Sequence, residues 1–307
     1  MNVIVFDLEW NQPVNGQRDT ISEIPFEVIE IGAVKFNFRK GIIDNFSELI
    51  KPTVYKDLHY IIRKIVNVTN KDLKDARVFR AVQTDFLKWC GKRYIFCTWG
   101  ELDLLEIQRN MNFYRMKSFD KKPFAYLDAQ KLFSICFEDG KSKRTLSYAV
   151  DYLGIEKELP FHRAHSDAYY TAKVLEKIDK YVIKNYVSYD TYTLPQTRKD
   201  EIRHRFPNYY KYISRIFENK TEALADKEVC STDCYICKKK TKPVVEMFTN
   251  NGKQYYNVYF CKKHGFQKSK IRVKKVGNKG VYIVKTMKMI KREAVNQIKL
   301  SSEKKDE

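Results

Sequence analysis

The first ten residues, MNVIVFDLEW, place two acids at the end of an apolar run. Alternate side chains of a β-strand share a face, so Asp7 and Glu9 are expected side by side. Burying two unpaired charges there would cost on the order of several kcal/mol, and the two would also repel each other. A divalent cation removes both penalties, and carboxylate oxygens are the ligands that Mg²⁺ and Mn²⁺ prefer. The alternative is a water-exposed strand end with two solvated acids.

A second acid-bearing segment, TWGELDLLE, suits the same chemistry. The pattern predicts a strand that ends at Thr98, a turn at Gly100, and Asp103 in the first turn of the next helix. Acids are also common at helix N-termini because of the helix dipole, so this segment alone decides little. Glu101 is a close competitor for the same role.

A third segment, PFHRAHSDAYY, places a histidine five residues before an acid. Ser166 is suited to cap a helix that begins near Asp167, which would hold this acid at a helix start. His162 is expected on the preceding loop, where an imidazole can take a proton from water near neutral pH. His165 is the alternative, but it lies within the turn, where a structural or solvent-facing role is expected.

Together, the FDLE motif, Asp103 after a Trp-Gly turn, and the H-x4-D spacing of His162 and Asp167 resemble the DEDDh exonucleases of the ribonuclease H-like superfamily. The resemblance spans residues 1–185. The TWGELD and HRAHSDA segments are most similar to the branch of histone-mRNA and small-RNA 3′-exonucleases. The related tyrosine branch has Y-x3-D, and Arg163 at that position excludes it.

This resemblance implies an α/β fold with a ribonuclease H-like mixed five-stranded sheet flanked by helices. It implies 3′→5′ release of nucleoside 5′-monophosphates from single-stranded nucleic acid, RNA or DNA, with RNA slightly preferred. His162 would remove a proton from the attacking water. Two ions of Mg²⁺ or Mn²⁺ would be held by the four acids Asp7, Glu9, Asp103 and Asp167.

One position departs from the RNA branch, in which some members carry a base-stacking aromatic residue immediately before the third acid. Leu102 stands there in this sequence, so Trp10 or Trp99 would have to stack instead. Two other functions stay open. One is a DNA proofreading or repair exonuclease with the same site, and the other is a non-catalytic nucleic-acid-binding adaptor, which a broken acid set would indicate.

A second candidate metal site lies in the last third of the chain, where four of the seven cysteines crowd together. Cys234-x2-Cys237 and Cys261-x2-His264 bracket two β-rich segments joined by an Asn-Asn-Gly turn. Two short ligand pairs around a hairpin are typical of a zinc ribbon with a structural zinc ion. Cys230 could replace Cys234 or stay free, and reduced surface thiols are the alternative to zinc.

The formal charge of +20 is concentrated at the end of the chain, because residues 229–307 carry 20 Lys and Arg against 6 Asp and Glu. Such an excess favours polyanions. Tyr255, Tyr256 and Tyr259 interleave with the lysines, a pattern that holds single strands by stacking. The expectation is a module that retains substrate. The alternatives are tyrosines that alternate in a strand and cover the helix predicted for the connecting segment (residues 191–228), and a surface that docks a partner or a ribosome.

The pattern along the chain predicts four regions. A helical connector is predicted from the spacing of Tyr209, Tyr212, Ile213, Ile216 and Phe217. The chain lacks a basic start and an apolar run of about 18 residues, so we expect a cytoplasmic protein with no membrane contact. The regions are the exonuclease domain (residues 1–190), the connector (residues 191–228), a small basic zinc-ribbon-like β module (residues 229–285), and a basic, frayed or disordered tail (residues 286–307).

Overall fold

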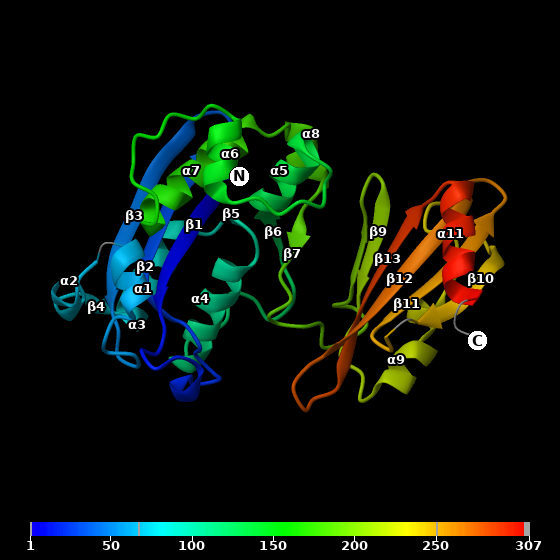
Figure 1. The fold of residues 1–307 in the computed structure, drawn as a ribbon, viewed down its shortest axis with the longest axis horizontal. Coiled ribbons are helices and arrows are strands. Elements are labelled where there is room, and N and C mark those ends of the chain that lie inside the picture. The colour runs from blue at the N-terminus through cyan, green and yellow to red at the C-terminus, as the bar shows by residue number, and fades with distance from the viewer. Residues whose placement is uncertain (1, 67, 250, 304–307) are drawn as a thin grey trace. The chain divides into compact units, whose positions relative to one another are not determined.

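The computed structural model describes residues 2–66, 68–249 and 251–303. The chain divides into two compact units, Met1–Tyr192 and Thr193–Glu307. Each unit is built around its own β-sheet (Figure 1). Within the described ranges, no helix is long and apolar enough to cross a membrane.

A mixed sheet with the strand order β4-β3-β2-β1-β5-β6-β7 forms the centre of the first unit. β1 is antiparallel to β2 and parallel to β5. The five-stranded mixed sheet predicted from the sequence corresponds to β3-β2-β1-β5-β6, and the two-residue strands β4 and β7 extend it at its edges. The strands are β1 (Asn2–Asn11), β2 (Glu27–Asn37), β3 (Gly41–Lys51), β4 (Arg77–Val78), β5 (Tyr94–Thr98), β6 (Ala125–Asp128) and β7 (Ser188–Tyr189).

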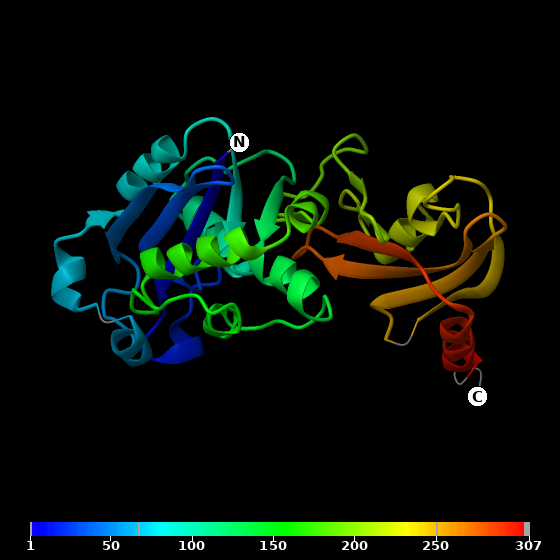
Figure 2. The same ribbon diagram turned by 90° about the horizontal axis from the view of Figure 1, so that it is seen from above.

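Helices cover both faces of this sheet. Ile4, Phe6 and Leu8 alternate along β1 and pack with α3 and α4 into the main core. α7 crosses β1 and β2 on the other face (Figure 2), which is the face of Asp7 and Glu9. The helices are α1 (Tyr60–Ile65), α2 (Asn70–Lys74), α3 (Phe79–Cys90), α4 (Leu102–Phe113), α5 (Ala129–Phe137), α6 (Leu146–Tyr152), α7 (Ala164–Lys177) and α8 (Lys180–Asn185), with a 3-10 helix at Gly16–Asp19.

A glycine in β2 lets α7 approach the sheet closely. Gly32 pairs with Asp7 on β1. A Cβ atom on Gly32 would lie 1.9 Å from the backbone nitrogen of His165 and 2.0 Å from the carbonyl carbon of Ala164. Any side chain at this position would therefore push the start of α7 away. Gly32 thus sets the distance between Asp7 and the helix that carries Asp167.

An antiparallel sheet with the strand order β10-β11-β12-β13-β9-β8 forms the second unit. The predicted hairpin around the Asn-Asn-Gly turn is present as β10 and β11, although Asn250 itself lies outside the described residues. The elements are β8 (Ile202–Arg205), β9 (Tyr209–Ile213), α9 (Lys220–Ala225), α10 (Lys227–Cys230), β10 (Lys242–Thr249), β11 (Gln254–Cys261), β12 (Gly265–Lys275), β13 (Val281–Met289) and α11 (Arg292–Glu303).

The helix predicted for the connector is wrong at its central segment. Tyr209, Tyr212 and Ile213 lie in strand β9, which pairs with β13, and Phe217 forms an isolated bridge to Val281. Tyr212 and Ile213 are adjacent and both fully buried. A short strand that is buried on both faces loses its two-residue alternation, so its apolar spacing resembles that of a helix.

The C-terminal segment is also more ordered than predicted. β13 continues to Met289, and α11 packs Val295 against Val245 and Val258. The second unit has a core of its own, in which Tyr259 and Ile283 are fully buried. It is therefore a larger domain than a zinc ribbon, and apolar burial contributes to its folding beside any metal.

Candidate active site and zinc centre

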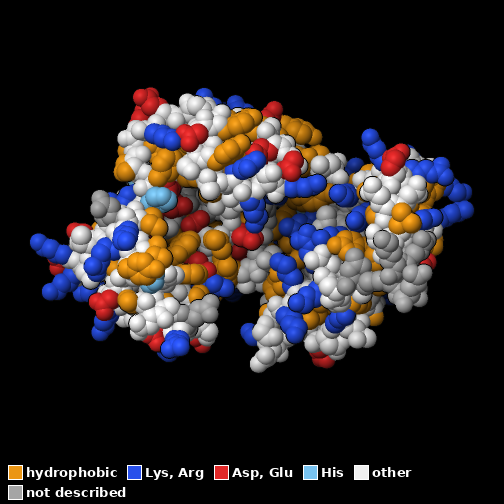
Figure 3. Space-filling view, in the orientation of Figure 1, with side chains coloured by type: hydrophobic (Ala, Val, Ile, Leu, Met, Phe, Trp, Pro, Cys, Tyr) orange, Lys and Arg blue, Asp and Glu red, His pale blue; other side chains and the backbone are white. Residues whose placement is uncertain are grey.

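The structure brings three of the predicted ligands together. Asp7 and Glu9 share one face of β1, and Asp167 lies in the first turn of α7. One carboxylate oxygen of each acid lies within 4.8 Å of the others. Figure 3 shows Asp and Glu side chains at the surface of the first unit, close to a His side chain.

Asp103 adjoins this group from α4. Its side chain is only 6% exposed, and its Oδ1 accepts a hydrogen bond of 3.3 Å from the backbone N–H of Leu8. Because Leu8 lies between Asp7 and Glu9, this bond ties the start of α4 to the strand with the acids. Glu101, the competitor considered from the sequence, is the exposed N-cap residue of α4.

Burial raises the pKa of all four acids, and repulsion from neighbouring carboxylates raises it further. Burial raises the pKa of Asp7 well above its ordinary value, and the charges of Asp103 and Asp167 raise it further. Burial and the charge of Asp167 raise the pKa of Glu9 to about 8. Burial also raises the pKa of Asp103 to about 7 and that of Asp167 to about 6. Four such acids need positive charge to ionise together near neutral pH.

One buried carboxylate oxygen of Asp167 lacks a hydrogen-bond partner in the described part of the chain. Among the residues that the structure describes, no donor reaches Oδ1 of Asp167. Leaving a buried acceptor unsatisfied costs about 1–3 kcal/mol, and more for a charged group. Mg²⁺ and Mn²⁺ prefer carboxylate oxygens, so the donor set fits divalent ions of this kind.

His162 lies on the loop before α7, as predicted, and its side chain is exposed. Its backbone φ of 63° is in the left-handed region, which non-glycine residues adopt rarely. Burial raises the pKa of Asp167, whereas the charge and backbone amide of His162 act in the opposite direction. The predicted cap at Ser166 is wrong, because α7 begins at Ala164 and Ser166 is buried within its first turn.

An ion pair that the sequence analysis missed fixes this loop. Glu30 lies opposite Glu9 on β2 and is 1% exposed. Its Oε1 accepts a hydrogen bond of 3.0 Å from Nη2 of Arg163, and its Oε2 accepts one of 3.1 Å from Nε. The paired contact neutralises a fifth carboxylate and anchors the residue after His162. The available signal was an acid inside the apolar strand segment FEVIEIGAV, where a buried charge needs a partner.

The two tryptophans considered for base stacking are held by packing contacts. Trp10 lies 5.7 Å from Phe26 between ring centroids. Trp99 donates Nε1 to the carbonyl oxygen of Arg144. Leu102, immediately before the third acid, is an apolar residue that is 56% exposed.

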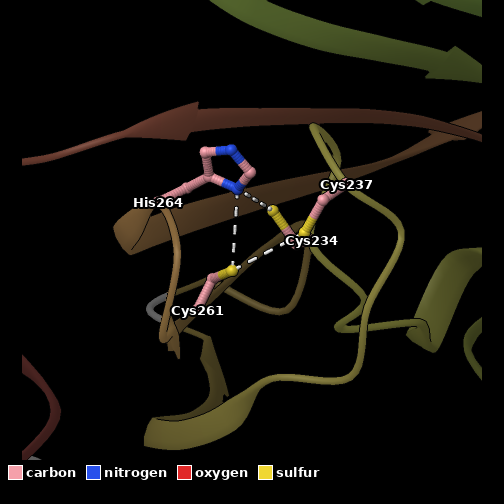
Figure 4. Close-up of side chains that lie close together, drawn as sticks. All are labelled: Cys234, Cys237, Cys261 and His264. Atoms are coloured by element: carbon pink, nitrogen blue, oxygen red, sulfur yellow. Dashed lines mark hydrogen bonds between the residues drawn. The ribbon is translucent and has the colours of Figure 1, made fainter.

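The four predicted zinc ligands converge in the second unit (Figure 4). Cys237 Sγ lies 3.8 Å from Cys261 Sγ, and His264 Nδ1 lies 3.4 Å from Cys234 Sγ and 3.7 Å from Cys261 Sγ. A tetrahedral ion with Zn–S bonds of about 2.3 Å places its sulfur ligands about 3.8 Å apart. The arrangement therefore has the dimensions of a structural zinc site.

Local backbone geometry supports this cluster. Burial raises the pKa of the Cys234 thiol, but hydrogen bonds from the amides of Cys237 and Ile236 outweigh it and bring the pKa to about 6. The thiolate is the form that binds metal. Cys230 is exposed and is not part of the cluster, so Cys234 is the ligand of the first pair.

The known proteins that match this chain match its first unit. The family model described as "RNase_T: Exonuclease" matches residues 4–175. The nuclease domain of 3′hExo, described as a DEDDh family member bound to rAMP, is 16% identical with a TM-score of 0.53, over 61% of this chain and 96% of that chain.

Two further solved structures show lower structural similarity. A 3′-exonuclease that recognises the 3′ end of a histone mRNA stem-loop is 16% identical with a TM-score of 0.49, over 63% of this chain and 92% of that chain. Cell-death related nuclease 4 is 19% identical with a TM-score of 0.48, over 57% of this chain and 62% of that chain. A search of curated protein sequences found no match. The family model spans more than half of the sequence, and the chain therefore belongs to the RNase_T exonuclease family, with the acids and histidine of the DEDDh pattern.

Proposed function

We propose that this protein is a metal-dependent 3′→5′ exonuclease that releases nucleoside 5′-monophosphates from single-stranded nucleic acid, with RNA slightly preferred over DNA. The observation that carries the proposal is the convergence of Asp7, Glu9 and Asp167, together with a buried oxygen of Asp167 that no donor in the described ranges reaches. Asp103 and His162 complete the set of groups that the chemistry requires.

Each residue has a role that follows from its position. When bound, two Mg²⁺ or Mn²⁺ ions would stabilise charge on the phosphate and lower the pKa of a water molecule. His162 is exposed on a loop beside Asp167, where its imidazole can accept a proton from the attacking water. The Arg163–Glu30 pair holds that loop, and Leu102 offers an apolar surface to the terminal nucleotide.

A solved structure of the same fold supports the preference for RNA and the direction of attack. The 3′hExo nuclease domain, which shares this fold, was solved with rAMP, a ribonucleoside monophosphate. A 5′-monophosphate is also the product that the proposed hydrolysis would release from the 3′ end of RNA.

Degradation of 5′-labelled single strands tests this function. The substrates are an RNA and its DNA counterpart with Mg²⁺ or Mn²⁺, and the proteins are the wild type, Asp7→Ala and Glu176→Ala. Glu176 is an exposed acid at the far end of α7, so its substitution removes one negative charge from the first unit without removing a predicted ligand. We expect a descending ladder from the wild type and Glu176→Ala, and none from Asp7→Ala. Intact substrate with every metal, with binding retained, would instead support a non-catalytic adaptor.

We also propose that Cys234, Cys237, Cys261 and His264 bind one structural zinc ion. The support is the donor set and its interatomic distances, which match a closed tetrahedral site. A closed site of this kind leaves no position for a reacting water, so its contribution is to the stability of the second unit.

A further inference from the structure

The sheet of the second unit has two faces of different chemistry. Ser269 and Ile271 of β12 are buried on one face. Lys268, Lys270 and Arg272 alternate with them and project from the opposite face. Their side chains are half-buried to exposed. One strand therefore presents three cations in a row on a face that its buried residues do not share.

The register of the sheet adds a fourth cation to this face. Lys288 of β13 lies directly opposite Lys268. Residues directly opposed in an antiparallel pair have Cβ atoms about 4.5–5.5 Å apart, and like charges there are destabilising. Burial and the charges of Lys288 and Lys270 lower the pKa of Lys268. The fold therefore holds together positive charges that repel each other.

No salt bridge within the described residues offsets this repulsion. Residues 247–292 contain thirteen Lys and Arg and not one Asp or Glu. Across the described part of the second unit, the ion pairs involve other residues, and none includes Lys268, Lys270 or Lys288. Figure 3 shows Lys and Arg side chains gathered over this unit with few acids among them. An external polyanion is the partner that would neutralise such a surface.

An aromatic ring positions two of the lysines. Nζ of Lys268 lies 4.7 Å and Nζ of Lys270 lies 5.4 Å from the ring centroid of Tyr256. The hydroxyl of Tyr256 donates to Oε1 of Gln254 at 2.9 Å, which fixes the ring in turn. Cation–π contacts of this kind hold ammonium groups in place without neutralising them.

This arrangement changes the expected mode of binding. Tyr255 and Tyr259 are 7% and 0% exposed in the core of the unit, so the sequence-based prediction that they stack on bases is wrong. They have a packing role, but the connecting helix that the alternative had them cover is strand β9. Tyr256 has lysines over its ring. The face thus presents fixed cations in place of a stacking platform, which is suited to phosphates and indifferent to base sequence.

We infer that the lysine face, defined as Lys268, Lys270, Arg272 and Lys288, binds the phosphate backbone of the single-stranded nucleic acid that the first unit digests. The choice of nucleic acid over other polyanions rests on the proposed function, because an exonuclease domain in the same chain brings this polymer to the protein. The contact retains long substrates and contributes nothing to hydrolysis itself.

Binding measured without catalysis tests the inference. The probe is a fluorescent single-stranded RNA of about 30 nucleotides, titrated in EDTA and followed by anisotropy at several salt concentrations. The variant is Lys268→Gln/Lys270→Gln/Lys288→Gln. The matched control is Lys199→Gln/Lys253→Gln/Lys279→Gln, which removes the same charge from exposed lysines elsewhere in the unit. Circular dichroism and zinc content check that both proteins are folded.

Counterion release sets the expected size of the effect. Each phosphate contact on a single strand contributes about 0.7 to the slope of log K against log salt, so three lost contacts lower the slope by about 2. At 0.1 M salt this corresponds to binding that is weaker by up to about 100-fold. The control should change affinity by less than about threefold. Hydrolysis of an oligomer of about four nucleotides with Mg²⁺ should be the same in all three proteins.

Three results would overturn the inference. One is equal weakening in both triple variants, which would assign the effect to net charge alone. Another is unchanged affinity in the face variant. The third is equally tight, equally face-dependent binding of polyglutamate, which would make the surface a site for acidic protein. Absence of nuclease activity in the wild type would contradict the proposed function but leave this binding result intact, because the titration needs no hydrolysis.

Discussion

Replacing Gly32 with alanine should disable the site without touching a ligand. The new Cβ would lie 1.9 Å from the backbone nitrogen of His165, whereas ordinary contacts begin at 3.4 Å. The start of α7 must therefore retreat by about 1.5 Å from β2. Asp167, two residues farther along α7, moves with it and away from Asp7 and Glu9. Misplacement of about 1 Å can cost roughly 100-fold in rate, so we expect kcat to fall at least that far.

The assay is the hydrolysis rate on a short RNA at saturating Mn²⁺, with Mn²⁺ affinity measured by calorimetry and folding measured by thermal denaturation. Overpacking should also destabilise the protein by about 1–3 kcal/mol. Gly41→Ala is the control, because Gly41 has a φ of 74° and open space around it. It should lose about 1 kcal/mol of stability and keep its rate. A Gly32→Ala enzyme with wild-type kcat and Mn²⁺ affinity would refute the close-approach reasoning.

Three other predictions concern stability and metal content. Arg163→Ala should lower the free energy of unfolding by about 2 kcal/mol, below the roughly 3–5 kcal/mol for a fully buried pair because the Arg163 side chain is 37% exposed. Adding Glu30→Gln should restore most of this loss, and no recovery in the double variant would show that the pair is not the cause. Glu9 has a folded pKa of about 8, above its ordinary value, so its contribution to the stability of the metal-free protein is present at pH 4.5 and lost as the pH rises to 8. In EDTA, the Tm should therefore fall more from pH 5 to pH 8 for the wild type than for Glu9→Gln, and the two falls should differ by a few °C. Equal falls in thermal denaturation would contradict the raised pKa of Glu9. Elemental analysis should find one zinc per chain in the wild type and in Cys230→Ser but none in Cys237→Ser, and zinc retained in Cys237→Ser would exclude the Cys₃His set.

Local patterns were sufficient to predict the ligands of the site. The alternation of β1 places Asp7 and Glu9 on one face whatever the rest of the chain does. The Gly-Glu-Leu-Asp turn places Asp103 at a helix start, and the four zinc ligands are two short pairs around one hairpin. Each of these features depends on neighbours in the sequence.

The features that were missed depend on partners far apart in the chain. The Glu30–Arg163 pair requires that β2 and the loop before α7 meet, and these are separated by more than a hundred residues. The role of Gly32 requires the same approach. Strand β9 is stabilised by pairing with β13, about seventy residues later, and its own apolar spacing did not distinguish strand from helix.

The Glu30–Arg163 pair also fixes the charge that the site presents. Five carboxylates surround the position between β1 and α7, and one guanidinium cancels Glu30 alone. When ionised, the remaining Asp7, Glu9, Asp103 and Asp167 carry four negative charges, the number that two divalent cations neutralise. Electroneutrality thus favours double occupancy. A single ion would leave two uncompensated negative charges, so a second ion is still attracted, but it meets half the charge and should bind more weakly than the first.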